Sequence, residues 1–285
     1  MRIKARFVIP MKIDVAETFF QKINIRVPEQ GREIGLYTIE SDLGSDLFAR
    51  ITNALKEFEI ECGYTEKRVY TKQEMANAPL FMITPLHCRA GYPQPEKEYL
   101  SVSFDSATGC PSCSNGRLQN APLHLRDDVK LGNADITGIE WMNELVVSTR
   151  ARTIIEQARL RGCTFWKLIA QNSNKPFETI FQLKITEQLP PMAEETVFLE
   201  AEAITLNGIT LRPFCKNGCG EKSLKSLPYY HVRDLHDLPD FALSYEWIGG
   251  GRGRFRIPFA SQKTYQLFRK SKINGLHFEP VILIP

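Results

Sequence analysis

WMNELVVSTRARTIIEQARLRGCTFWKLI, residues 141–169, contains a serine, an apolar helical stripe, a glycine and an apolar strand in that order. Ser148 predicts a helix N-cap, because its side-chain oxygen can accept from first-turn amides. Four residues recur at helical spacing behind it: Ala151, Ile154, Ile155 and Ala158. Gly162 predicts a left-handed reversal after the helix, and Cys163 to Ala170 predict the strand that follows.

A second stretch, WIGGGRGRFRIPFASQKTYQLFRKSKINGLHFEPVI at residues 247–282, repeats this order. Three pairs are separated by 113 residues: Ser148 and Ser261, Gly162 and Gly275, and Phe165 and Phe278. Upstream, two pairs are separated by 106 residues: Trp141 and Trp247, and Cys113 and Cys219. One insertion near Gly249 to Arg254 accounts for both offsets, which predicts a duplication. Two unrelated helix–strand units remain the alternative.

The first hundred residues predict an α/β or α+β unit of their own. Clusters of branched and aromatic residues predict strands at Ile3 to Ile9, Lys22 to Val27, Ile34 to Ile39 and Leu80 to Thr84. Apolar residues at helical spacing predict a helix from Ser45 to Glu59. Thr71-Lys72-Gln73-Glu74 fits a capping box and predicts a short second helix.

These patterns predict an α/β or α+β fold in two domains. An N-terminal α/β domain covers residues 1–105, and a duplicated domain covers residues 106–285. In the second domain, copy one spans about 106–175, connecting strands span 176–210, and copy two spans about 211–285. Each copy is a zinc knuckle followed by a helix, a glycine and a strand, and we expect both copies to share one mixed sheet.

Four of the seven cysteines form two close pairs, Cys110 with Cys113 and Cys215 with Cys219. Pro, Ser, Asn and Gly surround the pairs and favour the tight bends of zinc knuckles, in which two thiolates point at one ion. A structural zinc ion takes four ligands, so two pairs complete its shell without a histidine. The sequence therefore predicts one structural Zn²⁺ held by Cys110, Cys113, Cys215 and Cys219.

Other interpretations of the pairs stay open. CPxC also occurs in thiol redox proteins, where the first cysteine caps a helix, but Ser114-Asn115-Gly116 would end a helix here at once. A disulfide, four ordinary thiols and an iron site are further alternatives. The remaining cysteines, Cys62, Cys88 and Cys163, are expected to be small core residues.

Composition restricts the class of protein. A hydrophobic fraction of 43% with 24% charged residues indicates a globular chain. The net charge of +3 is spread without a dense basic block, which does not favour electrostatic nucleic-acid binding. The apolar run from Phe7 to Pro10 is too short for a signal peptide, and no uncharged stretch approaches a membrane span of roughly 20 residues. We expect a cytoplasmic protein without membrane contact.

The two cysteine knuckles, each followed by a Trp, a capped helix, a Gly and an apolar strand, resemble the bacterial double-CXXCG motif proteins. The resemblance covers roughly Gly109 to Pro285, and the ending from Ser261 to Val281 is similar to that of polymorphic-toxin immunity proteins. The chain departs from the family motif at Ser114 and in the extra residue of the second pair. The resemblance implies an immunity protein that binds and neutralises one cognate protein toxin.

The sequence leaves two other functions open. A zinc ribbon that binds nucleic acid or a nucleic-acid machine is the main alternative, with Arg252 and Arg254 on a Gly-rich loop as partner contacts. The segment from His231 to Asp240 is the densest ionisable cluster and would be the site of a hydrolase. Because no GxSxG, HExxH, Walker or dinucleotide motif is present, we expect a protein that is not an enzyme.

Overall fold

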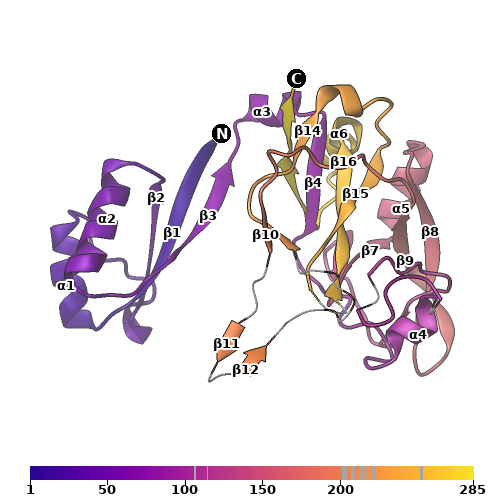
Figure 1. The fold of residues 1–285 in the computed structure, drawn as a ribbon, viewed down its shortest axis with the longest axis horizontal. Coiled ribbons are helices and arrows are strands. Elements are labelled where there is room, and N and C mark those ends of the chain that lie inside the picture. The colour runs from indigo at the N-terminus through magenta and orange to yellow at the C-terminus, as the bar shows by residue number, and fades with distance from the viewer. Residues whose placement is uncertain are drawn as a thin grey trace. The chain divides into compact units, whose positions relative to one another are not determined.

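The computed structural model describes residues 1–105, 107–113, 115–200, 204–206, 209–211, 215, 217, 219, 222–250 and 253–285. The chain is a mixed α/β protein with several sheets (Figure 1). It divides into two compact units, Met1–Asn77 and Ala78–Pro285. The predicted fold class is confirmed.

The first unit contains a three-stranded antiparallel sheet in the order β2-β1-β3. Its elements are β1 (Arg2–Pro10), α1 (Ile13–Lys22), η1 (Arg32–Ile34), β2 (Leu36–Asp42), α2 (Asp46–Glu57), β3 (Tyr64–Val69) and α3 (Lys72–Asn77). Two predicted helices are confirmed: Ser45 caps α2, with its Oγ accepting from Phe48 N at 3.1 Å, and Thr71 and Glu74 form the predicted reciprocal capping box of α3. The core packs the sheet against α1 and α2.

The strand predicted from Lys22 to Val27 is wrong. The chain there leaves α1, whose apolar side chains follow helical spacing: Ala16, Phe19, Phe20 and Ile23 are all fully buried. Since positions i, i+3, i+4 and i+7 share one helix face, this helical pattern outweighs the β-branched residues at its end.

The domain boundary at residues 105 and 106 is also wrong, because the division falls between Asn77 and Ala78. The cause is β4 (Leu80–Pro85), which lies in the second unit between β16 (Phe255–Ser261) and β17 (Leu276–Pro280). A strand with partners on both sides belongs to the unit whose sheet it completes.

The second unit contains a five-stranded sheet in the order β5-β8-β9-β7-β6 and a four-stranded sheet in the order β15-β16-β4-β17. The other members of these sheets are β5 (His124–Leu125), β6 (Ile136–Ile139), β7 (Met142–Ser148), β8 (Cys163–Ala170), β9 (Lys175–Ile185) and β15 (Phe241–Ile248). The helices α5 (Thr149–Gln157) and α6 (Gln262–Ser271) each join two strands of one sheet. The expectation that both copies share one sheet is therefore wrong, since each has its own.

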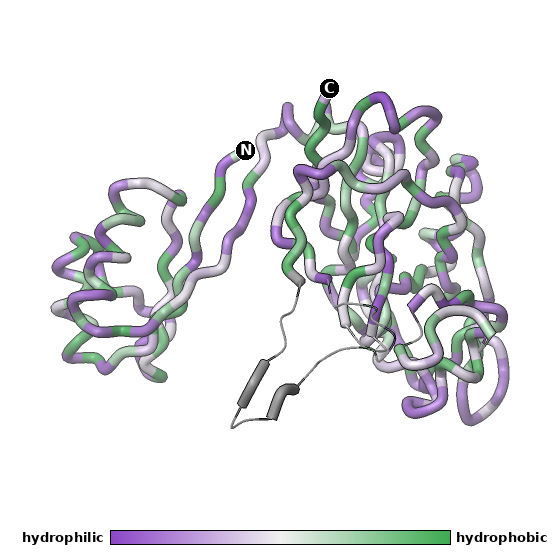
Figure 2. The backbone as a smooth tube through the Cα atoms, in the orientation of Figure 1, coloured by the Kyte–Doolittle hydropathy of each residue, from purple (hydrophilic) through white to green (hydrophobic). Residues whose placement is uncertain are grey.

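Shorter elements complete the second unit. They are α4 (Tyr99–Ser103), β10 (Phe198–Glu200), β11 (Ile204–Leu206), β12 (Ile209–Leu211), β13 (Lys222–Leu224), β14 (Tyr229–His231), η2 (Val232–Asp234) and β18 (Ile282–Ile284). The six short strands form three two-stranded sheets: β10 with β13, β11 with β12, and β14 with β18. Figure 2 shows hydrophobic and hydrophilic residues interspersed along the backbone. Within the described residues, none of the helices combines the length and the apolar character that a membrane crossing requires.

The two larger sheets have equivalent registers. We call residues 80–170 the first half and residues 175–280 the second half of this unit. Ser148 pairs with Ile180 in the five-stranded sheet, and Ser261 pairs with Leu80 in the four-stranded sheet. At the other edge of the central strand, Phe165 pairs with Leu183, and Phe278 pairs with Ile83. These registers are what a duplication would produce, although the duplication itself stays a prediction.

In each of the two larger sheets, one inner strand comes from the half that does not supply the two strands beside it. β9 opens the second half but pairs with β7 and β8, whereas β4 opens the first half but pairs with β16 and β17. The two halves are thus joined by a reciprocal exchange of one strand.

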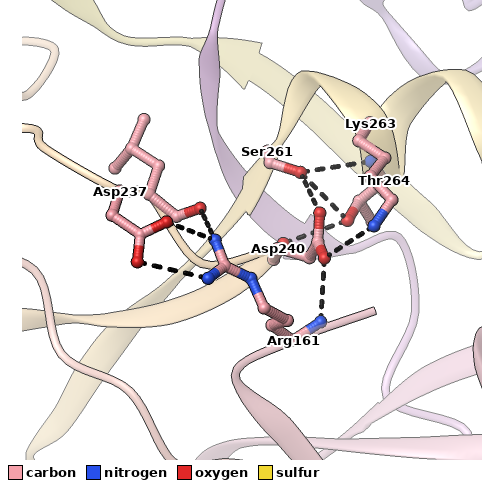
Figure 3. A network of polar contacts seen from close by, with 7 residues as sticks. Arg161, Asp237, Asp240, Ser261, Lys263 and Thr264 are labelled. Atoms are coloured by element: carbon pink, nitrogen blue, oxygen red, sulfur yellow. Dashed lines mark hydrogen bonds and ion pairs between the residues drawn. The ribbon is translucent and has the colours of Figure 1, made fainter. Parts of the chain in front are cut away.

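Buried acidic residues join the halves at equivalent points. Asp240 Oδ2 accepts from the amide of Arg161 at 2.8 Å, and its Oδ1 accepts from Ser261 Oγ at 2.9 Å (Figure 3). In the other half, Asp135 Oδ2 accepts from the amide of Asn274 at 3.2 Å, and its Oδ1 accepts from Ser148 Oγ at 3.3 Å. Each carboxylate thereby connects a serine cap of its own half to the loop that ends the opposite helix.

The glycines beside these carboxylates lie in the left-handed region, at φ +86° for Gly162 and +106° for Gly275. A Cβ on Gly162 would lie 2.0 Å from the carbonyl oxygen of Phe241, and one on Gly275 would lie 1.8 Å from that of Ile136. The prediction of left-handed glycines is confirmed. The left-handed residue that directly ends each helix, however, lies three residues before the glycine, at Arg159 and Lys272. The glycines instead allow the two halves to approach backbone to backbone.

Candidate metal centre

The four paired cysteines come together in space as the sequence predicts. One ligand atom from each of Cys110, Cys113, Cys215 and Cys219 lies within 4.8 Å of all the others. The Sγ atoms of Cys110 and Cys215, which are 105 residues apart in the chain, are 3.1 Å apart. The cluster could hold a metal ion and joins two loops from different halves of the second unit.

The first pair lies in a closed loop between α4 and β5. Phe104 and Gln119 form an antiparallel bridge at the base of this loop. Within it the amide of Cys110 donates to the carbonyl of Asn115 at 2.7 Å. Gly109 has φ +75°, and a Cβ there would lie 2.7 Å from the same carbonyl oxygen. The glycine and the short hydrogen bond bend the chain so that both thiols point to one side.

The second pair lies between β12 and β13, where Lys222 and Gly249 form a bridge at the end of the loop. Asn217 lies between the two cysteines and is exposed. Its backbone amide donates to Cys215 Sγ at 3.4 Å, and its Nδ2 donates to Cys110 Sγ at 3.3 Å. Asn217 therefore contacts one thiol of each pair. The sequence prediction counted Asn only as a turn former, and the cross-pair donor was missed.

The thiols differ in acidity because their surroundings differ. A hydrogen bond with Cys215 lowers the pKa of Cys110 to about 6, and backbone amides of the loop act in the same direction. Burial raises the pKa of Cys113 to about 12 and is also the main cause of the raised pKa of Cys219. Near neutral pH these pKa values favour the ionised form of Cys110 and the protonated forms of Cys113 and Cys219, so a bound cation has to displace protons from the last two.

The donor set and the spacing fit a tetrahedral thiolate site. Zn–S bonds of about 2.3 Å separate the sulfurs of a tetrahedron by about 3.8 Å. This spacing is longer than the 3.1 Å between Cys110 and Cys215 and lies within the 4.8 Å limit of the cluster. A disulfide bond needs about 2.05 Å, and all the cysteines are free thiols. Cys110 does not cap a helix as in thiol redox proteins, because residues 111–113 form a turn.

Of the two predicted partner-contact residues, Arg254 is not exposed. Arg254 is only 4% exposed, and its Nε donates to the carbonyl of Gly249 at 3.2 Å. Its own carbonyl accepts from Arg117 Nη2 at 3.0 Å. The prediction for Arg254 as a surface contact is wrong, because the side chain folds back onto the hairpin base. Arg252 lies outside the described residues.

In the ionisable segment from His231 to Asp240, which the sequence offers as the site of a hydrolase, His231 and Asp240 make structural contacts. His231 Nδ1 lies 2.9 Å from the carbonyl oxygen of Pro285. Ser261 Oγ accepts from the amide of Thr264 at 3.2 Å as a helix cap and bonds to Asp240. Lys263 Nζ also contacts Asp240, at 3.2 Å (Figure 3). The serine and the carboxylate act here as structural groups.

In comparisons with known proteins, no family model and no curated protein matches this chain. The resemblance to double-CXXCG motif proteins therefore stays an expectation from the sequence.

Proposed function

We propose that the chain is an immunity protein that binds and neutralises a cognate bacterial toxin, with a structural zinc ion on Cys110, Cys113, Cys215 and Cys219. The observation that carries the zinc part is the gathering of four thiols within 4.8 Å. Thiolates are the ligands that structural zinc sites prefer. The buried position of Cys113, which is 2% exposed, supports a structural role, since a catalytic zinc ion keeps one position open to solvent or substrate.

The immunity part rests on the resemblance of the cysteine knuckles and of the ending from Ser261 to Val281. The structure adds one supporting feature: Asp240, which belongs to the segment that a hydrolase would use, is bonded to the helix-capping Ser261. The zinc ion would keep the two cysteine loops together so that the surface of the second unit is preformed for a protein partner. Preformed surfaces bind with a smaller entropy cost than surfaces that order on binding.

The experiment that tests this function is co-expression with the toxin encoded beside the gene of this chain. We expect the wild-type chain to restore growth of cells that produce the toxin, and to co-purify with the toxin in a stable complex. The matched control is Cys62→Ser, which removes a cysteine of the first unit that is not part of the cluster, and this variant should protect fully. Cys113→Ser should protect poorly because it removes one zinc ligand. A wild-type chain that neither protects nor binds would contradict the proposal.

The nucleic-acid alternative rests on the cysteines from Cys110 to Cys219 as a zinc ribbon and on Arg252 and Arg254 as its contacts. Because Arg254 is buried, no observation favours that function over the first.

A further inference from the structure

Trp141 is a large aromatic residue that the fold leaves exposed. Its side chain lies in the two-residue turn between β6 and β7, and the residue is 51% exposed. The ring of Tyr92 lies against it, with centroids 4.3 Å apart. Tyr92 is hydrogen-bonded to Glu140, the other residue of the turn, and this bond raises the pKa of Tyr92. The two rings therefore form an ordered aromatic surface.

The backbone of Trp141 is unfavourable for such a residue. Its φ of +62° places it in the left-handed region, which glycine and asparagine adopt far more readily than an aromatic residue. A non-glycine residue in that region costs about 1–3 kcal/mol, and such residues concentrate at ligand-binding sites. An exposed tryptophan in this conformation is therefore not explained by the stability of the turn.

An open cavity of about 750 Å³ borders Trp141. Its apolar wall includes Leu100, Ile139, Met142 and Phe255. A side chain of a partner that stacked on Trp141 would also reach this wall. Tryptophan and tyrosine beside an apolar pocket are typical of the residues that dominate the energy of protein interfaces.

A second cavity, of about 340 Å³, shares Met142, Asn143 and Phe255 with the first. Its charged lining residues are Arg117, Lys184, Arg254, Arg256 and Glu144. Four of these five charges are positive. Arg117 and Arg254 are 7% and 4% exposed, so their charges lie close to the cavity and are weakly screened by water.

We propose that these two cavities form one docking groove for an acidic, apolar segment of a protein partner. An apolar side chain of the partner stacks on Trp141 and fills the larger cavity, and a carboxylate enters the smaller one. The positive excess at the cavity wall selects a carboxylate, and arginine pairs well with carboxylates. The inference deepens the proposed function and rests on it, because the partner is the toxin that the chain neutralises.

The decisive variant is Trp141→Gly, which separates binding from folding. Glycine suits φ +62°, so the variant should unfold at the same temperature as the wild-type protein or at a higher one. Its affinity for the purified toxin should fall by about tenfold or more, measured by surface plasmon resonance. The matched control is Tyr245→Ala, an equally exposed aromatic residue, 53% exposed, outside both cavity linings. This control should bind like the wild-type protein.

The charge of the partner is tested with Glu144→Gln. Removing the one negative charge of the smaller cavity should strengthen toxin binding, by about twofold to tenfold at low salt. Added sodium chloride should weaken binding of the wild-type protein.

The outcomes separate the two proposals. Toxin binding that is unchanged in Trp141→Gly would overturn the groove and leave the immunity function standing. Loss of both affinity and thermal stability in that variant would assign Trp141 a structural role and overturn the groove. Weaker binding by Glu144→Gln would overturn the acidic partner segment. A wild-type protein that does not bind the toxin would overturn the function and the groove together.

Discussion

The two halves of the second unit match in their sheets and differ in their cysteine loops. In both halves a serine caps the helix, accepting from the amide three residues on, and a left-handed glycine precedes the next strand. The loop of the first half is closed by its own backbone bonds between residues 105 and 118. The loop of the second half has one more residue between its cysteines, and its Asn217 reaches across to Cys110.

This difference indicates that the sheets and the cysteine loops are stabilised by different interactions. The sheets are stabilised by burial and by the exchange of strands, so they need no ligand. Among the described residues of the cysteine loops, the contacts between the two loops run through the thiols and Asn217, and a metal ion bound by the thiols would add directly to their stability. The predictions below test this contrast. Unfolding of the second unit can be followed by tryptophan fluorescence, because all three tryptophans, Trp141, Trp166 and Trp247, lie in it.

The largest effect is expected for the zinc ligands. Cys113→Ser and Cys219→Ser should each abolish stoichiometric zinc binding, because three thiolates leave the tetrahedral shell incomplete. Zinc contributes on the order of 10 kcal/mol to the folding of small zinc domains, so we expect a loss of several kcal/mol here. Metal content and urea denaturation are the measurements, with Cys88→Ser as the control. Unequal zinc loss in the two variants would contradict a shared site.

The next effect is expected where the halves meet backbone to backbone. Gly162→Ala and Gly275→Ala should each destabilise the second unit by about 3 kcal/mol, because both combine positive φ with a blocked Cβ position. The values should agree within about 1 kcal/mol if the halves are equivalent. Gly63→Ala, where nothing lies within 4 Å of the new Cβ, is the control for urea denaturation. A tolerated substitution at either site would break the equivalence.

A smaller effect is expected for the buried carboxylates. Asp240→Ala should cost about 3 kcal/mol and Asp135→Ala about 2 kcal/mol, because each leaves amide and hydroxyl donors without an acceptor. Asp240 should cost more since its bonds to the amide and to the serine are shorter, 2.8 and 2.9 Å against 3.2 and 3.3 Å. Urea denaturation of both variants at pH 7 measures the two losses of unfolding free energy. A larger loss for Asp135→Ala than for Asp240→Ala would contradict the expected order.

The smallest effect is expected for the helix caps. Ser148→Ala and Ser261→Ala should each cost about 1 kcal/mol, the usual value for an N-cap serine. The Ser261→Ala substitution should cost slightly more, because the Ser261 hydroxyl donates to Asp240 at 2.9 Å whereas the Ser148 hydroxyl donates to Asp135 at 3.3 Å. Threonine at either position should restore most of the lost stability, since it keeps the hydroxyl. Failure of threonine to restore it would indicate a packing role.

Local features of this fold could be predicted from the sequence. The caps at Ser45, Ser148 and Ser261, the left-handed glycines and the meeting of the cysteine pairs each depend on a few neighbouring residues or on the chemistry of one residue type. The cysteine cluster is non-local, yet four thiols in two turn-rich pairs restrict the possibilities strongly. That is why the candidate site was found more completely than the sheets.

Non-local features were not predictable in the same way. β4 pairs with β16 and β17, whose residues are about 180 to 200 positions away, and nothing in the composition of β4 identifies those partners. The same limit explains the misplaced domain boundary. Arg254 was misjudged because a Gly-rich flank predicts an exposed loop, whereas its guanidinium returns to the carbonyl of Gly249.

The most direct test of the zinc centre is the metal content and sulfur coordination of the full chain, purified without chelator. Elemental analysis should give one zinc ion per chain, and X-ray absorption at the zinc edge should show four sulfur neighbours at about 2.3 Å. A protein that contains no zinc, or zinc bound through nitrogen and oxygen, would contradict a site made of Cys110, Cys113, Cys215 and Cys219.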